Sequence, residues 1–249
     1  MRESCQRPSL NTADIEVRAY AAQLDYNFIS PRPWTFSSNK IFPSIYSLGK
    51  RLLDIVVALT ALILTSPLFL LIALLIKFKS PGSVFFCHER LGLHGQPFKC
   101  WKFRTMVPNA EEVLKQWLEH NPSLRQEFMK HFKLKEDPRI IPKIGDFLRR
   151  TSLDELPQFI NVLKGEMSVV GPRPIVQKEV EFYGDRVAKF FSVKPGITGL
   201  WQVSGRNDID YNDRIRLELK YVDKQSFFLD LAIIFKTTLL FLKCNHNGY

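Results

Sequence analysis

Apolar residues fill nearly every position between Leu52 and Ile76. A helix of this length would extend about 37 Å at about 1.5 Å per residue, which exceeds the roughly 30 Å of hydrocarbon in a bilayer. The run is also too long and too uniformly apolar for the usual buried helix of a globular core. The pattern therefore predicts a membrane-inserted helical segment.

Ser66 and Pro67 interrupt this run near its middle. Pro67 has no N–H to donate to the carbonyl oxygen of Ile63, and its ring crowds that carbonyl, so we expect the helix to kink there. The Ser66 hydroxyl can donate to a carbonyl oxygen one turn earlier. Each arm of such a bent helix would reach about one leaflet deep.

Positive charge lies at both ends of the run, with Lys50 and Arg51 before it and Lys77 and Lys79 after it. Because Lys and Arg favour the cytoplasmic side of a membrane, a re-entrant hairpin that enters and leaves by the same face satisfies both ends. An ordinary spanning helix with a tolerated proline is the alternative, and these residues alone do not separate the two. We expect Arg51 and Asp54 to anchor the hairpin to the interface and to the globular domain.

The whole pattern predicts a mainly helical α+β protein in four segments. We assign residues 1–46 to a polar, partly disordered extension and residues 47–79 to the membrane hairpin. Residues 80–243 would form a small cytoplasmic catalytic domain, and residues 244–249 a tail.

Three further patterns lie within the predicted domain. Strand-like runs at residues 84–87 and 98–104 flank a glycine-containing loop and predict a short β-hairpin. Residues 109–132 are typical of a charged amphipathic helix or helix pair. The stretch from Phe227 to Leu242 is apolar but contains Asp230, and it is short for a membrane span, so we expect an interfacial helix.

Composition narrows the range of partners. The chain of 249 residues has 35 Lys and Arg against 25 Asp and Glu, a net charge of +10. This charge suits nucleic acid or the anionic lipids of a cytoplasmic leaflet, and the lipid-inserting segment favours the lipids. No motif supports nucleic-acid binding.

The chain has four cysteines, Cys5, Cys87, Cys100 and Cys244. Their spacing is neither that of disulfide pairs nor that of metal ligands, which is typical of a reduced protein that faces the cytoplasm.

Candidate chemistry is concentrated around Asp154 and Glu155, at the start of an apolar-periodic helix. The helix begins either with a Ser152 capping box or with Asp154 as its N-cap. Unpaired N–H groups stabilise anions at such an end, so both carboxylates should be ionised and a phosphate could bind beside them. Because consecutive helical residues point about 100° apart, one carboxylate can face a reacting phosphorus while the other holds a cation. The plain alternative is a cap and its dipole partner.

A second signal is Arg173, which lies between Pro172 and Pro174. The fixed φ angles of the prolines stiffen the backbone around a guanidinium that suits bidentate binding of a phosphate. Further on, Gln202 and Arg206 lie in a loop that could contact a nucleotide or a sugar, although the need for tight turns explains the glycines of this loop equally well.

Six ordered blocks of this sequence resemble the bacterial sugar transferase family, the monotopic phosphoglycosyl transferases that start polysaccharide assembly on polyprenyl phosphate. The resemblance runs from about residue 48 to residue 242. The blocks are Lys50–Asp54, the Ser66–Pro67 break, Lys102–Met106, Leu153–Gln158, Val170–Pro174 and Lys194–Arg206. Family members enter and leave the membrane on one side, so the resemblance favours the re-entrant hairpin, at the cytoplasmic face of the bacterial inner membrane.

The resemblance implies a two-step exchange that begins exopolysaccharide or related glycoconjugate synthesis. Asp154 would attack the β-phosphorus of a UDP-sugar, release UMP and carry the phosphosugar as an acyl phosphate until undecaprenyl phosphate collects it. Glu155 would be a ligand of Mg²⁺, which neutralises charge on the diphosphate. Galactose or glucose is the expected sugar by likeness to relatives alone. The rival function is a non-catalytic membrane scaffold of a polysaccharide assembly complex, and the sequence leaves a homo-oligomer open.

The same reaction would need a cationic clamp for its charged donor. The candidates, in order of preference, are Arg173, Arg104, Lys102, Arg149 and Arg206, with Gln202 as a further substrate contact. For the four candidates after Arg173, a solvated charge or a contact with lipid head groups is the alternative.

Overall fold

The structure is a computed structural model that describes residues 45–121, 124–125, 128, 134, 137–205 and 209–242. Arg206, the tail at 244–249 and nearly all of the extension at 1–46 lie outside the described residues. The helices are α2 (Ile45–Lys79), α3 (Ala110–His120), α5 (Ile144–Thr151), α6 (Gln158–Lys164), α7 (Val187–Phe190), α8 (Tyr211–Lys224) and α9 (Phe227–Leu242).

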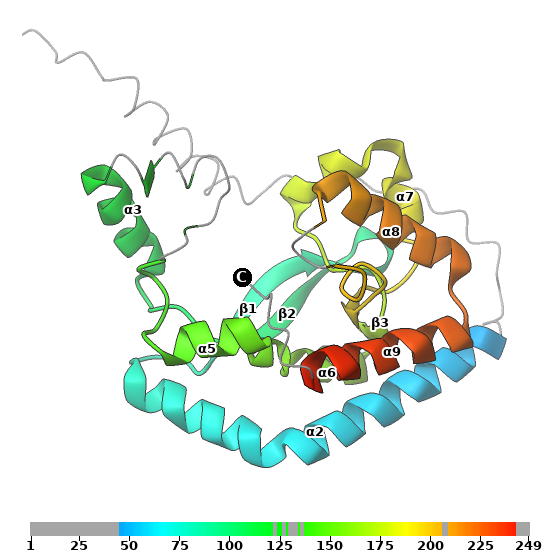
Figure 1. The fold of residues 1–249 in the computed structure, drawn as a ribbon, viewed down its shortest axis with the longest axis horizontal. Helices are drawn as coiled ribbons and strands as arrows, with labels where there is room; N and C mark the ends of the chain where they lie inside the picture. The colour runs from blue at the N-terminus through cyan, green and yellow to red at the C-terminus, as the bar shows by residue number, and fades with distance from the viewer. Residues whose placement is uncertain are drawn as a thin grey trace, which may run out of the picture. The chain divides into compact units, whose positions relative to one another are not determined.

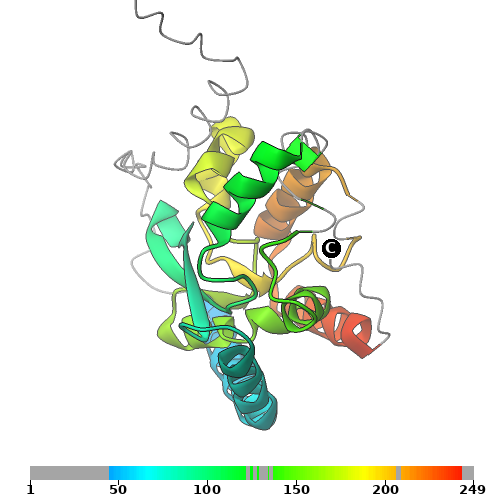
Figure 2. The same ribbon diagram turned by 90° about the vertical axis from the view of Figure 1, so that its left-hand side faces the viewer.

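The strands are β1 (Phe85–Leu91), β2 (Pro97–Phe103), β3 (Ser168–Val170) and β4 (Gly196–Thr198). Three segments form 3-10 helices: η1 (Leu93–Gly95), η2 (Leu153–Glu155) and η3 (Gln177–Arg186). The described chain is therefore mainly helical with two small sheets, which confirms the predicted class. In two perpendicular views, α2 and α9 lie toward one edge, and α7 and α8 lie toward the opposite edge (Figure 1, Figure 2).

The predicted β-hairpin is confirmed. β1 and β2 pair antiparallel, from Phe85 opposite Phe103 to Leu91 opposite Pro97. β1 is longer than the run that predicts it, because hydrogen bonds to β2 continue through the polar residues His88, Glu89 and Arg90 to the buried Leu91. The predicted amphipathic helix at 109–132 is represented by α3, which ends at His120.

The sequence pattern does not predict the second sheet, because strands of three residues are too short for a periodic signal. β3 and β4 pair parallel, with Ser168 opposite Gly196 and Val170 opposite Thr198. A Cβ on Gly196 would lie 2.1 Å from the backbone nitrogen of Gly171, so glycine is required where these two segments meet. This close pairing fixes the backbone that leads from β3 into the following loop.

The apolar run forms most of α2, which contains Pro67 and bends near its middle (Figure 1). The Ser66 hydroxyl donates to the carbonyl oxygen of Ile63 at 2.8 Å, the carbonyl that Pro67 cannot serve. Ile63 and Leu64, beside the bend, are 69% and 74% exposed. Among the described residues, α2 is the helix that is long and apolar enough to cross a membrane. The predicted kink and the role of the hydroxyl are confirmed.

Polar contacts join the first arm of α2 to the globular part. Arg51 donates to the carbonyl oxygens of Val162 and Leu163 at the end of α6, at 2.7 and 2.8 Å. The buried Asp54 carboxylate accepts from the Ser168 hydroxyl at 2.9 Å and from the next backbone N–H of β3 at 2.8 Å. Arg51 and Asp54 thus anchor α2 to the domain, which is part of the role that we predicted for them.

Lys50 joins the same arm to α9. Its ammonium lies 2.9 Å from the carboxylate of Asp230, which also accepts from the hydroxyls of Tyr46 at 3.0 Å and Tyr221 at 2.6 Å. Asp230 is fully buried, so it faces the protein, although the apolar pattern of α9 marks it as an interruption. On the same helix, the apolar side chain of Phe228 is exposed.

Two apolar clusters complete the packing around α2. The first joins α2 to α6, β3 and α9 through Ala58, Val162, Val169, Val170 and Ile233. The second joins the other arm of α2 to β2 and α5 through Ile72, Ile76, Phe103, Ile141 and Leu148. Both arms of α2 therefore pack against the domain, and the segment from α5 to β3 lies along them.

Asp230→Ala should destabilise the fold by about 3 to 5 kcal/mol, because it leaves the Lys50 ammonium and two tyrosine hydroxyls without their buried partner. Unfolding of the purified protein in detergent, by heat or denaturant, would measure the loss. The control is Asp223→Ala, which removes a surface pair with Lys189 and should cost no more than about 1 kcal/mol. Equal losses in the two variants would contradict a structural role for the buried pair.

Candidate active site

Asp154 and Glu155 lie on η2, a single 3-10 turn between α5 and α6. An α-helical turn would need an N–H on Pro157 to donate to the carbonyl oxygen of Leu153. Pro157 has none, and the N–H of Leu156 donates to that oxygen at 3.3 Å instead. The tighter 3-10 bonding of the two carboxylate residues follows from this proline.

Both helix starts that we expected are wrong. Ser152 has left-handed backbone angles, with φ at 56°, and its side chain makes no cap hydrogen bond. α6 begins at Gln158, so Asp154 is not its N-cap and Pro157 precedes its first residue. The two carboxylates stand in a separate turn before α6.

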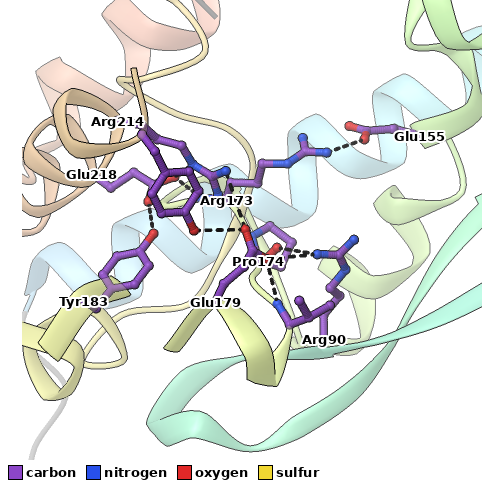
Figure 3. A network of polar contacts seen from close by, with 10 residues as sticks. Arg90, Glu155, Arg173, Pro174, Glu179, Tyr183, Arg214 and Glu218 are labelled. Carbon is purple, nitrogen blue, oxygen red and sulfur yellow. Dashed lines mark hydrogen bonds and ion pairs between the residues drawn. The ribbon is translucent and has the colours of Figure 1, made fainter. Parts of the chain in front are cut away.

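Lys102 of β2 contacts both carboxylates. Its ammonium lies 2.7 Å from Glu155 Oε1 and 3.6 Å from Asp154 Oδ2. Arg173 adds a second cation, with Nη2 3.5 Å from the same Glu155 oxygen (Figure 3). The four side chains are only 12% to 31% exposed, so salt screens these ion pairs less than it screens pairs on the surface.

The two carboxylates differ in their acidity. Burial raises the pKa of Asp154 to about 6, with Glu155 adding to the rise and Lys102, Arg149 and Arg173 opposing it. Burial would also raise the pKa of Glu155, but the pull of Lys102 and Arg173 outweighs it and lowers the pKa to about 2. At neutral pH both groups are therefore ionised, and Asp154 is the one closer to protonation.

A small pocket opens beside these groups. It is lined by Arg90, Cys100, Lys102, Glu155, Gln158, Arg173, Pro174, Gly196 and Ile197. Three of the lining side chains are cations and one is a carboxylate, so the pocket favours a ligand with negative charge. Asp154 is connected to this group through Lys102.

The backbone of Arg173 is held by α8. Its N–H donates to Glu218 Oε1 at 3.3 Å. Glu218 is fully buried and also accepts from Arg214 Nε at 3.2 Å and from the Tyr183 hydroxyl (Figure 3). A buried carboxylate from a distant element therefore fixes the position of Arg173, in addition to the prolines beside it.

Four of the predicted site residues meet here: Lys102, Asp154, Glu155 and Arg173. Arg149 of α5 is close enough to lower the pKa of Asp154, although it does not line the pocket. Its predicted contact with the donor stays a prediction.

Arg104 lies elsewhere. Its buried guanidinium donates to the carbonyl oxygens of Ser80 at 2.8 Å and Pro81 at 2.6 Å, in the turn after α2. These contacts tie the end of β2 to the end of α2. The position of Arg104 therefore gives no support to the predicted role in donor binding.

Gln202 is buried in the loop after β4. Neither atom of its amide group has a hydrogen-bond partner among the residues that the structure describes. Buried amide atoms are rarely left unpaired, so a water or a ligand group is the expected partner. Arg206, predicted from the same loop, lies outside the described residues.

Sequence reasoning missed Arg90, which lines the pocket from β1. In the hairpin register Arg90 is opposite Phe98, and the pairs two and four positions along are His88 with Cys100 and Phe86 with Lys102. Alternate residues of paired strands share a face. That period of two, applied to the predicted hairpin, could have placed Arg90 on the same face as Lys102.

Glu155 is the residue best suited to hold a divalent cation. Among the described residues, no three acidic, histidine or cysteine side chains gather to form a metal site by themselves. Mg²⁺ in phosphate-transfer enzymes is commonly held by one or two carboxylates together with substrate phosphates and waters. The ionised Glu155 carboxylate at the pocket fits a Mg²⁺ that arrives with a diphosphate, and it does not fit a cage made by the protein alone.

Comparison with known proteins gives the family of this chain. The model of the family described as bacterial sugar transferase matches residues 45–244. The chain is 49% identical over 193 residues to the exopolysaccharide production protein ExoY of Rhizobium meliloti, and the match covers 78% of this chain and 85% of that protein.

In two further relatives, the match covers less than half of the relative's own length. The chain is 50% identical over 194 residues to the undecaprenyl-phosphate galactose phosphotransferase of Salmonella typhimurium, a match that covers 78% of this chain and 40% of that protein. It is 42% identical over 197 residues to the UDP-glucose:undecaprenyl-phosphate glucose-1-phosphate transferase of Escherichia coli, with 76% and 39% covered. On the family match and these identities, the chain belongs to the bacterial sugar transferase family.

Proposed function

We propose that this chain transfers a sugar 1-phosphate from a UDP-sugar to undecaprenyl phosphate and releases UMP, as the first membrane step of exopolysaccharide or related glycoconjugate synthesis. Two similar proteins are named for a transfer of this kind, one with galactose and one with glucose 1-phosphate, and a third is named for exopolysaccharide production. The single observation that carries the proposal is the buried pair of carboxylates, Asp154 and Glu155, beside a cationic pocket. By likeness to these proteins, the sugar is galactose or glucose.

The reaction has two half-reactions at one phosphorus. In the first, a carboxylate oxygen of Asp154 attacks the β-phosphorus of the donor, and the bond from that phosphorus to the bridging oxygen breaks. UMP leaves with the bridging oxygen and the bonding electrons, and the phosphosugar stays on Asp154 as an acyl phosphate. In the second, a phosphate oxygen of undecaprenyl phosphate attacks the same phosphorus, and Asp154 leaves as a carboxylate. No proton has to move in either half-reaction.

The charges around the pocket suit this chemistry. A carboxylate and a charged diphosphate repel each other, and fixed cations that face the reacting phosphate reduce that repulsion. Arg173 offers a planar fork of N–H donors for phosphate oxygens, and Lys102 helps to keep Asp154 ionised. Mg²⁺ held by Glu155 would add positive charge at the diphosphate when it is bound.

We also propose that α2 is a re-entrant helix and that the site lies at the cytoplasmic face of the inner membrane. Both arms of α2 rise from the bend toward the side on which α6 and the hairpin lie (Figure 1). Exposed apolar side chains cover α2 and part of α9, and basic residues flank both ends of the apolar run. Basic flanks are attracted to the anionic lipids of the cytoplasmic leaflet. The phosphate of a polyprenyl lipid would then meet Asp154 at the water–lipid boundary.

Labelling should place both ends of α2 on the cytoplasmic side. Single cysteines would be introduced at the exposed positions Ile45 and Lys79, in a chain whose native cysteines are replaced. A membrane-impermeant maleimide should react with both in inverted membrane vesicles and with neither in intact spheroplasts, because a re-entrant helix returns to the side it came from. Labelling of the two positions from opposite sides would show a spanning helix.

Asp154→Asn should remove the covalent chemistry. With donor and no acceptor, the native chain should release about one UMP per enzyme and gain the mass of a sugar phosphate, and Asp154→Asn should be slower by about a thousandfold or more. Intact-protein mass spectrometry and UMP release measure both. Asp146→Asn, which breaks an exposed pair with Arg150, is the matched control and should keep full activity. Continuous UMP release without acceptor would indicate a hydrolase, and normal lipid product from Asp154→Asn would indicate a scaffold.

Lowering the pH should slow the first half-reaction over the range in which Asp154 becomes protonated. Its folded-state pKa is about 6, so the attacking carboxylate is lost as the pH falls through that value. The second-order rate constant for UMP release should therefore drop about tenfold between about pH 7 and about pH 5. Leaving out the acceptor avoids the titration of its own phosphate near the same pH. An acid limb near about pH 4, where an ordinary aspartate titrates, would count against this assignment.

A further inference from the structure

Arg90 is a pocket-lining cation that the proposed reaction leaves without a role. Its side chain is 21% exposed, and it lies on the same face of the hairpin as Lys102. Lys102 and Arg173 both reach Glu155, whereas Arg90 pairs with Glu179 of η3, which does not line the pocket. Arg90 therefore places a positive charge at the pocket, and the carboxylate that pairs with it, Glu179, lies outside the pocket lining.

The contacts of Arg90 are long. Its Nη1 lies 3.5 Å from Glu179 Oε2 and 3.4 Å from the carbonyl oxygen of Pro174, both near the limit for a hydrogen bond (Figure 3). The Glu179 carboxylate also accepts hydrogen bonds from Val176 N–H at 2.9 Å and the Tyr211 hydroxyl at 3.0 Å, and it forms an ion pair with Arg214 Nη1 at 3.7 Å. Because the negative charge of Glu179 is divided among these groups, much of the charge of Arg90 remains for a ligand.

The lining cations differ in their relation to the nucleophile. Lys102 lies 3.6 Å from Asp154 Oδ2, whereas Arg90 is opposite Phe98 in the hairpin, four residues of β2 before Lys102. Four residues of extended strand span about 13 Å, so Arg90 comes from a part of the hairpin farther from Asp154 than Lys102 is. Displacement at phosphorus puts the attacking and leaving oxygens roughly in line, so the leaving group lies on the side of the phosphorus away from the nucleophile.

We propose that Arg90 binds the phosphate that leaves with the nucleotide, which is the α-phosphate of the UDP-sugar and then the phosphate of UMP, and that Glu179 is the positioning residue that holds its guanidinium at the pocket. This assignment rests on the proposed function. The leaving phosphate gains negative charge as the bridging bond breaks, and a guanidinium can donate two parallel hydrogen bonds to it. UMP has left before undecaprenyl phosphate reacts, so Arg90 acts in the first half-reaction only.

Arg90→Gln separates the two half-reactions. With donor alone, UMP release should slow by about 10- to 100-fold, and the inhibition constant of UMP should rise by a similar factor, as expected for the loss of charge-assisted hydrogen bonds. Arg90→Lys keeps the charge without the fork and should recover part of both effects. The covalent phosphosugar enzyme, allowed to form fully and freed of UMP by gel filtration, should transfer to undecaprenyl phosphate within about twofold of the native rate.

Arg216→Gln is the matched control, because Arg216 is 80% exposed on α8 and pairs with Asp213. It should change neither half-reaction. Equal losses in both half-reactions of Arg90→Gln would show a merely structural role, and no loss in either would leave Arg90 without a part in the reaction; both results overturn the assignment.

Calorimetric binding of UMP to the same proteins, with no donor present, tests Arg90 independently of the chemistry. Native binding by Arg90→Gln would overturn the assignment, and binding weakened by about tenfold or more would support it. Absence of a covalent intermediate in the native chain would count against the proposed function, and the UMP measurement would still decide the part of Arg90.

Discussion

Two adjacent carboxylates stay ionised in a buried place only when cations stand beside them, and Lys102 meets that condition for Asp154 and Glu155. The three residues come from β2 and η2, so the site exists only while the hairpin is packed against the connection from α5 to α6. The same contacts separate the acidity of the two groups. Lys102 and Arg173 lower the pKa of Glu155 to about 2, whereas burial raises the pKa of Asp154 to about 6, so Asp154 is the group closer to protonation at neutral pH.

The helix that meets the lipid is also part of the domain core. Arg51 serves the last carbonyls of α6, Asp54 holds β3, and Lys50 reaches the buried Asp230 of α9. These elements either precede the loop of Arg173 or pack beneath it. Loss of α2 from the chain would therefore remove the support of the active site along with the attachment to the membrane.

Features that depend on a local pattern could be predicted from the sequence. The apolar run, its break at Ser66 and Pro67, the hairpin and the pair at Asp154 and Glu155 each follow from neighbouring residues. Features that depend on tertiary packing could not. β3 is too short to show a period, and nothing local turns Asp230 inward.

The two cations of one sequence block illustrate that limit. Lys102 and Arg104 are two positions apart, and the sequence predicts that both bind the UDP-sugar donor. In the structure, Lys102 forms ion pairs with the two carboxylates, whereas Arg104 donates hydrogen bonds to the turn after α2. Two residues of extended chain span about 7 Å, and that short strut links the end of α2 to the ammonium group beside Asp154. A displacement of the end of α2 would therefore be passed through this strut to Lys102 and to the two carboxylates that it contacts.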